Sequence, residues 1–417
     1  MSSPIWHPFT QHGLGEDIPV IERAMGAALF GADGRRYVDA ISSWWVTTHG
    51  HCHPRIMAAI RAQTETLDQL IFAGWTHEPA ETLARALVDI TPAGLDHVFF
   101  SDSGSTSVEV ALKMALGTWL NRGEPRHRIV VMEHSYHGDT IGAMSVGERG
   151  VYNRAYQPLL FDVETLPFPR GDGDATIAAL EEICAQNPPP AALIVEPLVL
   201  GAGGMLIYRP DILKELRDIC AREGVLFIAD EVMTGWGRTG LTFACQQAGV
   251  APDLMCLSKG LTGGAVPLAA TLATREIFDA HLSEDRARMF FHSSSYTANP
   301  IACAAANANL AIWQDEPVLA RVRRLAERQA RRLEKLDHPV IVGKRQIGTI
   351  VAMEFVDPYG DYLSSIGPIL GRFFRNRGLL LRPMGNTVYV MPPYCTDDGD
   401  LDAIYEAIAS AAQEVAA

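Results

Sequence analysis

Two polar residues follow short apolar runs, at positions where their side chains could carry out chemistry. Asp230 follows such a run in GVLFIADEV, and Lys259 does so in DLMCLSKG. In a sheet of parallel strands, ligands bind at the edge where the strands end. A lysine amine forms an imine with an aldehyde, and a carboxylate keeps a pyridine nitrogen protonated, as a pyridoxal-phosphate (PLP) enzyme requires. A structural salt bridge would use the same two residues, so both interpretations stay open here.

Two further segments favour a cofactor site. Ser103-Gly104-Ser105 follows the apolar run HVFFSD and opens a predicted helix that begins near Thr106. Free backbone N–H groups at a helix N-terminus bind phosphate, although Ser and Gly are also ordinary helix caps. Tyr136, in SYHGD after the run RIVVMEH, offers a ring that could stack on a flat heterocycle or lie half-buried in a plain turn.

The elements that position these residues alternate between about residues 55 and 310. Short apolar segments bounded by turn residues are separated by segments with helical periodicity, which predicts a parallel sheet covered on both faces. A helix is expected from Pro54 and another over 210–224, because Pro near the start and Gly224 at the end are typical boundaries. The expected strands lie in HVFFSD, RHRIVVME, AALIVEPLV, GVLFIADEV and DLMCLSKG.

The two flanking regions have other patterns. Residues 1–54 read as turns and short strands with a hairpin at Asp33-Gly34, and we expect them to pack with a small domain. That small α+β domain is expected over 311–417, and the large cofactor-binding domain over 55–310. The predicted elements of the C-terminal region are a long helix over about 299–335, a strand at 347–355, a helix near 365–377, a strand in TVYVMPPY and a final Ala-rich helix.

Composition limits the class of protein. The chain has 417 residues, 48% hydrophobic, with 35 Lys and Arg against 49 Asp and Glu and a net charge of −14. That balance argues against nucleic acid or an anionic membrane as a partner. The seven cysteines have no paired spacing, which favours free thiols in a reducing compartment. No signal peptide and no membrane-spanning run is recognised, so we expect a soluble cytoplasmic protein.

Three motifs are set aside. GWGRTG at 235–240 fits a dinucleotide-binding pattern but lacks the βαβ context. The cluster His49, His51, Cys52 and His53 has metal-ligand residue types but no distant fourth-ligand motif, so no metal is expected. Ser258-Lys259 lacks the S-x-x-K spacing of acyl-serine enzymes. The Arg-rich run RVRRLAERQARRLEKL is interleaved with Glu and Leu, which favours a solvated helix face over a nucleic-acid surface.

Nearly end to end, the chain resembles the class III aminotransferases, which are fold type I PLP enzymes. The matching motifs are DSGSTSVEVALKMA, SYHGDTIGAMS, IVEPLVLGAGGM, FIADEVMTGWGRTG, LSKGLTGGAVPLAATL and YTANPIACAAA. The resemblance implies a large, mostly parallel-sheet domain, a small α+β domain and PLP as cofactor. It further implies a role for each of six residues: Gly104 and Ser105 on the phosphate, Tyr136 on the ring, Asp230 on the ring nitrogen, Glu196 close to the cofactor, and Lys259 as the imine-forming lysine.

Four further segments resemble the family members of biotin biosynthesis: IWHPFTQH, ISSWW, HSSSYTANP and LLLRPMGNTVYVMPPY. This resemblance implies amino transfer from S-adenosylmethionine to 8-amino-7-oxononanoate. It also implies a homodimer with active sites at the subunit interface, where Ser294 and Ser295 reach the phosphate of the neighbouring subunit's cofactor. The implied substrate contacts are Phe9, Trp44, Tyr136, Ser293, Arg382 and Tyr389, together with Lys259.

Several alternatives stay open. Phe9 stands where many members carry Tyr, and HSSSY replaces the HGPTF of some members, so S-adenosylmethionine, lysine and other amines all stay open as the donor. Other class III ω-aminotransferases, a PLP-dependent decarboxylase or racemase, and a catalytically silent binding protein are the remaining functions. Trp44 and Trp45 could also be core residues, with Arg382 paired to a surface acid.

Overall fold

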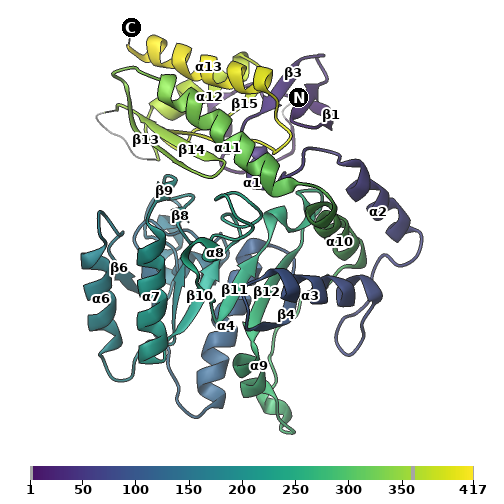
Figure 1. Ribbon diagram of the computed structural model, residues 1–417, viewed down its shortest axis with the longest axis vertical. Coiled ribbons are helices and arrows are strands. Elements are labelled where there is room, and N and C mark those ends of the chain that lie inside the picture. The colour runs from purple at the N-terminus through teal and green to yellow at the C-terminus, as the bar shows by residue number, and fades with distance from the viewer. Residues whose placement is uncertain (1–2, 358–361, 417) are drawn as a thin grey trace.

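A seven-stranded sheet forms the centre of the larger, lower part of the molecule in Figure 1. The computed structural model describes residues 3–357 and 362–416. Every strand predicted from an apolar run between residues 95 and 257 is present in this sheet. The strand order is β4 (Leu95–Ser101), β12 (Ala269–Thr274), β11 (Leu254–Leu257), β10 (Leu226–Asp230), β7 (Ala192–Val195), β5 (Ile129–Met132) and β6 (Glu164–Leu166).

The sheet is not wholly parallel. Strand β12 runs antiparallel to both neighbours, pairing Leu257 with Ala270 and Ser101 with Ala269. It was missing from the strands predicted by sequence because AATLAT reads as a small-residue segment of weak β-propensity. The parallel pairs β10·β11 and β10·β7 keep the ends of the central strands at one edge.

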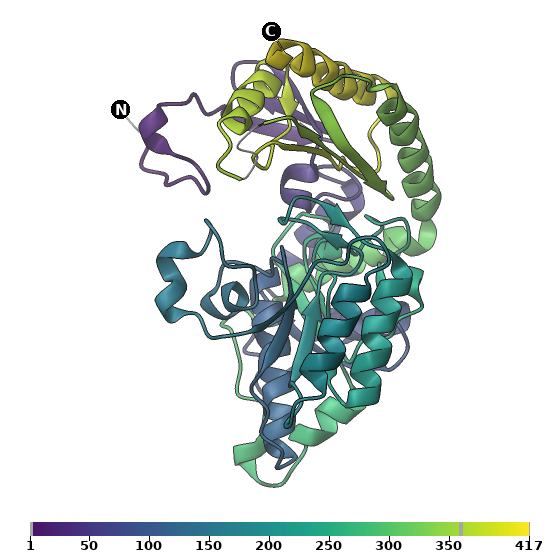
Figure 2. The same ribbon diagram turned by 90° about the vertical axis from the view of Figure 1, so that its left-hand side faces the viewer.

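Helices cover both faces of this sheet, as the alternation predicted (Figure 1, Figure 2). On β10, Leu226 and Ile228 pack with residues of α4 (Gly104–Asn121), while Phe227 and Ala229 pack with α7 (Pro210–Glu223). Both faces of the strand are therefore apolar, which explains the unbroken hydrophobic run. The other covering helices are α3 (Glu78–Ile90), α6 (Asp174–Cys184), α9 (Arg275–His281) and α10 (Pro300–Asp315).

Two small sheets lie in the upper part of Figure 1 and share one core. The parallel pairing of Leu379 with Val38 attaches the N-terminal strands to the C-terminal region. The first sheet contains β1 (Ile21–Met25), β2 (Ala28–Gly31), β3 (Arg36–Asp39) and β15 (Leu379–Leu380). The second contains β13 (Ile341–Ile347), β14 (Ile350–Phe355) and β16 (Thr387–Val390), with α11 (Val318–Lys335), α12 (Ile366–Asn376) and α13 (Asp398–Ala416) beside them.

Local signals placed several elements correctly and two incorrectly. The hairpin of β2 and β3, the start of α2 (Pro54–Thr64) and the end of α7 at Gly224 are confirmed. The single helix predicted over 299–335 is wrong, because α10 ends before Pro317 and α11 begins after it. The strand predicted at 347–355 is wrong at its start, because residues 348–349 form the turn between β13 and β14.

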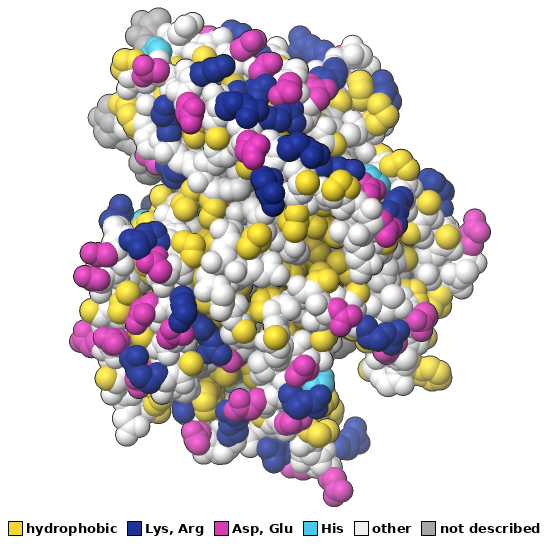
Figure 3. Space-filling model, viewed as in Figure 1, with side chains coloured by type: hydrophobic (Ala, Val, Ile, Leu, Met, Phe, Trp, Pro, Cys, Tyr) yellow, Lys and Arg dark blue, Asp and Glu magenta, His cyan; other side chains and the backbone are white. Residues whose placement is uncertain are grey.

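Arginines of helix α11 form ion pairs with acidic residues of α13. Arg328 and Arg332 pair with Asp398 at 2.8 and 2.9 Å, and Arg332 also pairs with Asp402 at 2.7 Å. Figure 3 shows acidic side chains among the basic ones on this face. Across the described residues, no helix has the length and apolar character needed to cross a membrane.

The remaining elements are short and lie mainly in connections. They are η1 (His12–Leu14), α1 (Ser42–Trp45), α5 (Ile141–Ser145), η2 (Arg154–Leu159), β8 (Val199–Leu200), β9 (Leu206–Ile207), α8 (Cys245–Ala248), η3 (Lys259–Thr262) and η4 (Arg286–Arg288).

Candidate active site

Lys259 and Asp230 lie at the same edge of the large sheet. Their strands are parallel neighbours, and Asp230 pairs in register with Cys256, so Lys259 emerges just beyond it. Lys259 has a left-handed backbone (φ 47°) and opens η3. Both side chains line a cavity of about 210 Å³ between the two parts of the molecule. The structure thus brings together the two residues that the sequence singled out.

Burial sets the electrostatics of the lysine. The pKa of Lys259 is lowered by loss of hydration, against the opposing effects of the Asp230 and Glu196 carboxylates, while the Arg238 cation lowers it further. An amine with a lowered pKa is neutral for more of the time near pH 7, so it can act as a nucleophile and a base.

Asp230 is held by a histidine that the sequence did not single out. The Nδ1 of His137 lies 2.7 Å from Oδ2 of Asp230, and both side chains are buried. The N–H of Val232 donates to the other carboxylate oxygen at 3.1 Å. His137 follows directly after Tyr136 in SYHGD, so the signal was adjacent to a residue already chosen. Among the described residues, Nε2 of His137 has no hydrogen-bond partner.

Glu196 is a buried carboxylate on the floor of the same cavity. It accepts hydrogen bonds from the backbone N–H groups of Tyr136 at 3.0 Å and Gly201 at 2.9 Å. Burial is the largest effect on its acidity and, with the nearby Asp230 charge, raises the pKa of Glu196 to about 7. Burial also raises the pKa of the Tyr136 hydroxyl, which stays neutral.

The start of α4 forms a seat for an anion. Ser103 caps the helix through a reciprocal bond with Thr106, which leaves the first N–H groups, those of Gly104 and Ser105, for a ligand. A Cβ on Gly104 would lie 2.7 Å from Val232, and one on Gly138 would lie 2.1 Å from the Ser105 hydroxyl. Glycine at both positions therefore lets the backbone lie close to the Val232 and Ser105 side chains at this helix start.

An aromatic wall and one arginine form the outer side of the cavity. The Arg382 guanidinium carbon lies 5.4 Å from the Trp44 ring centre and 5.6 Å from that of Phe9. Its Nη2 donates to the Tyr362 hydroxyl at 3.0 Å, and it forms no ion pair with any described carboxylate. The alternative in which Arg382 pairs with a surface acid therefore finds no support in the described part of the chain.

The two tryptophans of ISSWW differ in environment. Trp44 is 43% exposed and faces the cavity mouth, whereas Trp45 is buried. The Trp45 indole N–H donates to the Tyr389 hydroxyl at 3.0 Å, and its ring centre lies 5.0 Å from the Lys259 nitrogen. Burial raises the pKa of Tyr389 to about 12. Sequence reasoning missed Tyr152 and Tyr362, which line the cavity with ring centres 4.4 Å apart.

The serines of HSSSY lie away from this chain's own cavity. The Ser294 hydroxyl donates to Asp102 at 2.5 Å, and Ser295 accepts a bond from Gln69 at 2.6 Å through its carbonyl. The Ser293 hydroxyl donates to the Ser294 carbonyl at 3.2 Å. Among the residues lining the described cavity, none of the three serines is present.

Two of the motifs that were set aside, the histidine cluster and GWGRTG, make contacts within the protein. His49 faces Asn309 at 2.9 Å and His51 faces Asp39 at 2.8 Å, and no metal-binding group of three or more residues occurs in the described chain. In GWGRTG, Trp236 and Arg238 are buried. Arg238 donates to the carbonyls of the turn at 45–47 and of Pro392.

Comparisons with known proteins agree with this geometry. The profile of the family described as aminotransferase class-III matches residues 12–412. The chain belongs to the class III aminotransferases. An adenosylmethionine-8-amino-7-oxononanoate aminotransferase from Synechococcus elongatus is 49% identical to this aminotransferase over 99% of each chain.

Solved structures of the family superpose over nearly the whole chain. The adenosylmethionine-8-amino-7-oxononanoate aminotransferase from Methanocaldococcus jannaschii has a TM-score of 0.94 at 33% identity, covering 99% of this aminotransferase and 97% of that chain. An amine transaminase from an uncultivated Pseudomonas species, solved in a PLP-bound form, has a TM-score of 0.91 at 33% identity and covers 99% of both chains.

Proposed function

We propose that this aminotransferase uses PLP to move an amino group from S-adenosylmethionine to 8-amino-7-oxononanoate, giving 7,8-diaminononanoate in biotin biosynthesis. The observation that carries the proposal is the Arg382 cation, which lies beside the Phe9 and Trp44 rings and has no carboxylate partner among the described residues. An apolar chain ending in one carboxylate needs such a wall and such a cation. The full-length identity to the Synechococcus relative supports the same substrates.

The residues present fit PLP. The free N–H groups of Gly104 and Ser105, with the Ser105 hydroxyl, would take its phosphate. Gly138 lets its segment lie directly against Ser105, because a Cβ there would be 2.1 Å from the Ser105 hydroxyl. Tyr136 would stack on the ring and Asp230 would hold the ring nitrogen. When bound, PLP supplies an aldehyde that condenses with amines and a ring that accepts electrons.

Lys259 would hold the cofactor covalently and then, once displaced by a substrate amine, carry a proton at its Nζ. Its partial loss of hydration keeps that nitrogen basic but not permanently charged. His137 would keep the Asp230 carboxylate oriented through its 2.7 Å bond. Glu196, bound by two backbone N–H groups, would fix the Tyr136 segment against the cavity.

The substrate residues divide between the two ends of the cavity. Arg382 would bind the carboxylate of the keto acid, with Phe9 and Trp44 along its chain and Tyr389 behind Trp45. Ser293 would contact substrate from the neighbouring subunit's side. The sulfonium donor and the keto acid would use the cavity in turn, in a ping-pong reaction.

We further propose a homodimer in which Ser294 and Ser295 reach the partner's cofactor phosphate. Segments 68–75 and 289–299 lie together, since Gln69 donates to the Ser295 carbonyl and Asn299 to the Asp68 carbonyl. Both segments expose large apolar side chains, as a surface covered by a second copy would. These exposed residues are Ile71, Trp75, Met289, Phe291 and Tyr296.

The proposed organisation has residues 1–54 packed with the small domain at 311–417, and a large domain at 55–310. Pairing of β3 with β15 supports the first of these contacts. A cytoplasmic location is proposed from the free state of all seven cysteines.

Separate half-reactions test the donor. The PLP form is mixed with S-adenosylmethionine, lysine or alanine, and loss of the visible absorbance is followed in each mixture. We expect S-adenosylmethionine to react, and the resulting amino form to convert 8-amino-7-oxononanoate. Reaction with lysine or alanine alone would disprove the proposed donor.

An amine transaminase is the second candidate, favoured by the PLP-bound Pseudomonas structure at a TM-score of 0.91. Such an enzyme would accept a simple aryl or alkyl amine as donor. Two results would favour this candidate. One is a rapid half-reaction with such an amine, and the other is an equal kcat/KM for keto substrates with and without a carboxylate.

A further inference from the structure

The turn that carries both tryptophans has an unusual backbone. Ser42, Ser43 and Trp45 all have positive φ, at 54°, 59° and 67°. Ser43 combines its φ with a ψ of −94°, and Trp44 lies at φ −120° and ψ 56°. A γ-turn with positive φ is rare for a residue with a Cβ, and such conformations persist only when their surroundings hold them.

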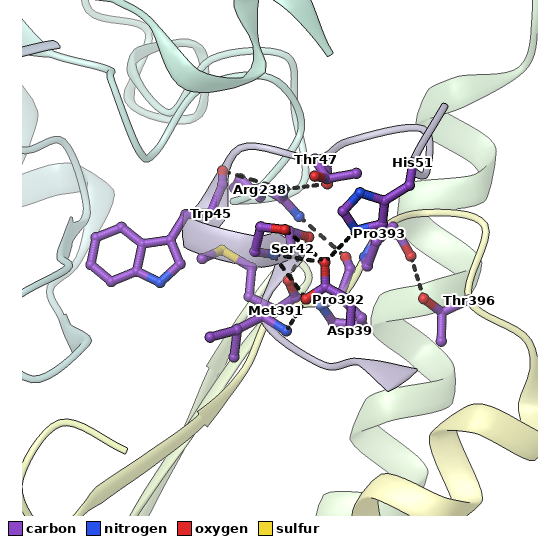
Figure 4. A network of polar contacts seen from close by, with 12 residues as sticks. Asp39, Ser42, Trp45, Thr47, His51, Arg238, Met391, Pro392, Pro393 and Thr396 are labelled. Atoms are coloured by element: carbon purple, nitrogen blue, oxygen red, sulfur yellow. Dashed lines mark hydrogen bonds and ion pairs between the residues drawn. The ribbon is translucent and has the colours of Figure 1, made fainter. Parts of the chain in front are cut away.

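A buried carboxylate binds this turn (Figure 4). Asp39, the last residue of β3, is fully buried. Its two oxygens accept the Ser43 N–H at 2.8 and 2.7 Å, and Oδ1 also accepts the Ile41 N–H at 3.2 Å. The Ser43 hydroxyl donates to Oδ2 at 3.3 Å, and His51 Nε2 lies 2.8 Å from the same oxygen. Asp39 therefore contacts the residue with the most strained backbone.

Other groups bind the same turn. The Ser42 hydroxyl donates to the Met391 carbonyl at 2.8 Å. The buried Arg238 guanidinium donates to the carbonyls of Thr47 at 2.9 Å and Trp45 at 3.4 Å. Figure 4 shows the Trp45 indole pointing away from this network. The network therefore binds the backbone of the turn, while the ring lines the cavity.

The position of the turn sets the position of the Trp45 ring. That ring packs against Gly201, where an added Cβ would lie 3.2 Å from it. Gly201 in turn donates its N–H to Glu196 at 2.9 Å. With its ring centre 5.0 Å from the Lys259 nitrogen, Trp45 is part of the wall around the reacting group.

We propose that Asp39, with His51 as its partner, is a positioning residue that holds the Ser42–Trp45 turn in its strained form and so places both indoles against substrate and cofactor. This inference rests on the proposed function for its substrate and cofactor. It assigns a task to part of the histidine cluster that resembles a metal site, since His51 faces Asp39.

The test compares Asp39→Asn and His51→Phe with Asp33→Asn, a matched control at an exposed hairpin position of the same sheet. We expect Asp39→Asn to lower kcat/KM for 8-amino-7-oxononanoate about 10- to 100-fold, mainly through KM, because misplacement by about 1 Å has such effects. His51→Phe should act in the same direction. The visible circular dichroism of the bound cofactor should change in both variants and stay unchanged in the control.

A rescue variant isolates the backbone strain. Glycine adopts positive φ without a Cβ penalty, so Ser43→Gly added to Asp39→Asn should recover part of the lost kcat/KM and of the dichroism. No recovery in the double variant would show that Asp39 does not act by holding Ser43.

Two other results would overturn the proposal. One is an Asp39→Asn protein with parental kcat/KM and parental dichroism. The other is a lower melting temperature and cofactor content in the variant, with normal KM and dichroism in the fraction that has bound cofactor. That result would show that Asp39 has a purely structural role. If the parental enzyme does not aminate the keto acid, the proposed substrate is wrong, yet the dichroism still tests the placement of Trp45.

Discussion

Arg382→Met should impair the recognition of one substrate group without disturbing the chemistry. The guanidinium lies beside two aromatic rings and donates one N–H to Tyr362, which leaves further donors for a carboxylate. A hydrogen bond to a charged group contributes about 1.5–3 kcal/mol, and this side chain is only partly buried, so two bonds together contribute about 3 kcal/mol. That corresponds to a rise of about 150-fold in KM for the keto acid.

The effect should fall on KM and not on kcat. The carboxylate is remote from the reacting carbon, so its binding stabilises ground state and transition state alike. Arg382→Lys, which keeps the charge but loses the planar fork, should show a smaller rise of about 10-fold. Arg372→Met on the exposed face of α12 serves as the control, since its nearest carboxylate lies 3.9 Å away.

Steady-state kinetics with the keto acid and its methyl ester give the measurement. The KM of the parental enzyme should be about 150-fold lower for the acid than for the ester, and Arg382→Met should have similar KM values for both. The protein change and the substrate change form a double-mutant cycle, which isolates the contact between Arg382 and the carboxylate. The reasoning is refuted if the variant still discriminates acid from ester as strongly as the parent, because the carboxylate would then bind elsewhere.

Three further changes test the cofactor site. Gly138→Ala places a Cβ 2.1 Å from the Ser105 hydroxyl at a φ of 130°, so the Kd for PLP, measured by fluorescence titration of cofactor-free protein, should rise at least about 10-fold; an unchanged Kd contradicts the phosphate seat. Burial raises the pKa of Glu196 from 4.5 to about 7, so the unfolded chain loses this proton first as pH rises. The free energy of unfolding should then fall by about 3 kcal/mol between pH 4.5 and pH values above 7. Urea unfolding of Glu196→Gln should lack this fall, and equal pH profiles for the two proteins would contradict the raised pKa of Glu196. Lys259→Ala should remove the characteristic visible absorbance and lower kcat by at least about 100-fold, and retention of both would exclude Lys259 as the reactive amine.

Local patterns were enough for the strand ends that carry the reactive pair. Asp230 and Lys259 follow runs buried on both faces, and parallel neighbours necessarily end at one edge. The anion seat was also visible, because a helix start leaves N–H groups free whatever the rest of the fold does. The orientation of β12 was not visible, since hydrogen-bond direction depends on which strands become neighbours.

The substrate wall depended on contacts that no local pattern encodes. Phe9, Trp44 and Arg382 come from three distant segments, and only the family resemblance joined them before the structure did. Asp39 was overlooked because a carboxylate after a strand reads as a turn residue. His51 was considered only as a possible metal ligand, because the local sequence does not distinguish a metal ligand from a histidine that contacts one carboxylate.

The antiparallel direction of β12 affects the motions open to the reactive lysine. The chain leaves β11 and re-enters the sheet on the adjacent strand at the same edge, so the segment 258–268 is a short closed loop. The Ser258 hydroxyl donates to the Leu268 carbonyl at 2.8 Å across its base, and that of Thr262 donates to the Val266 carbonyl at 2.6 Å inside it. The N–H groups of Leu261 and Gly263 donate within the loop, to the carbonyls of Ser258 and Gly260, both at 2.9 Å. These two amide hydrogens beside the lysine should therefore exchange with solvent more slowly than that of the exposed Ala265.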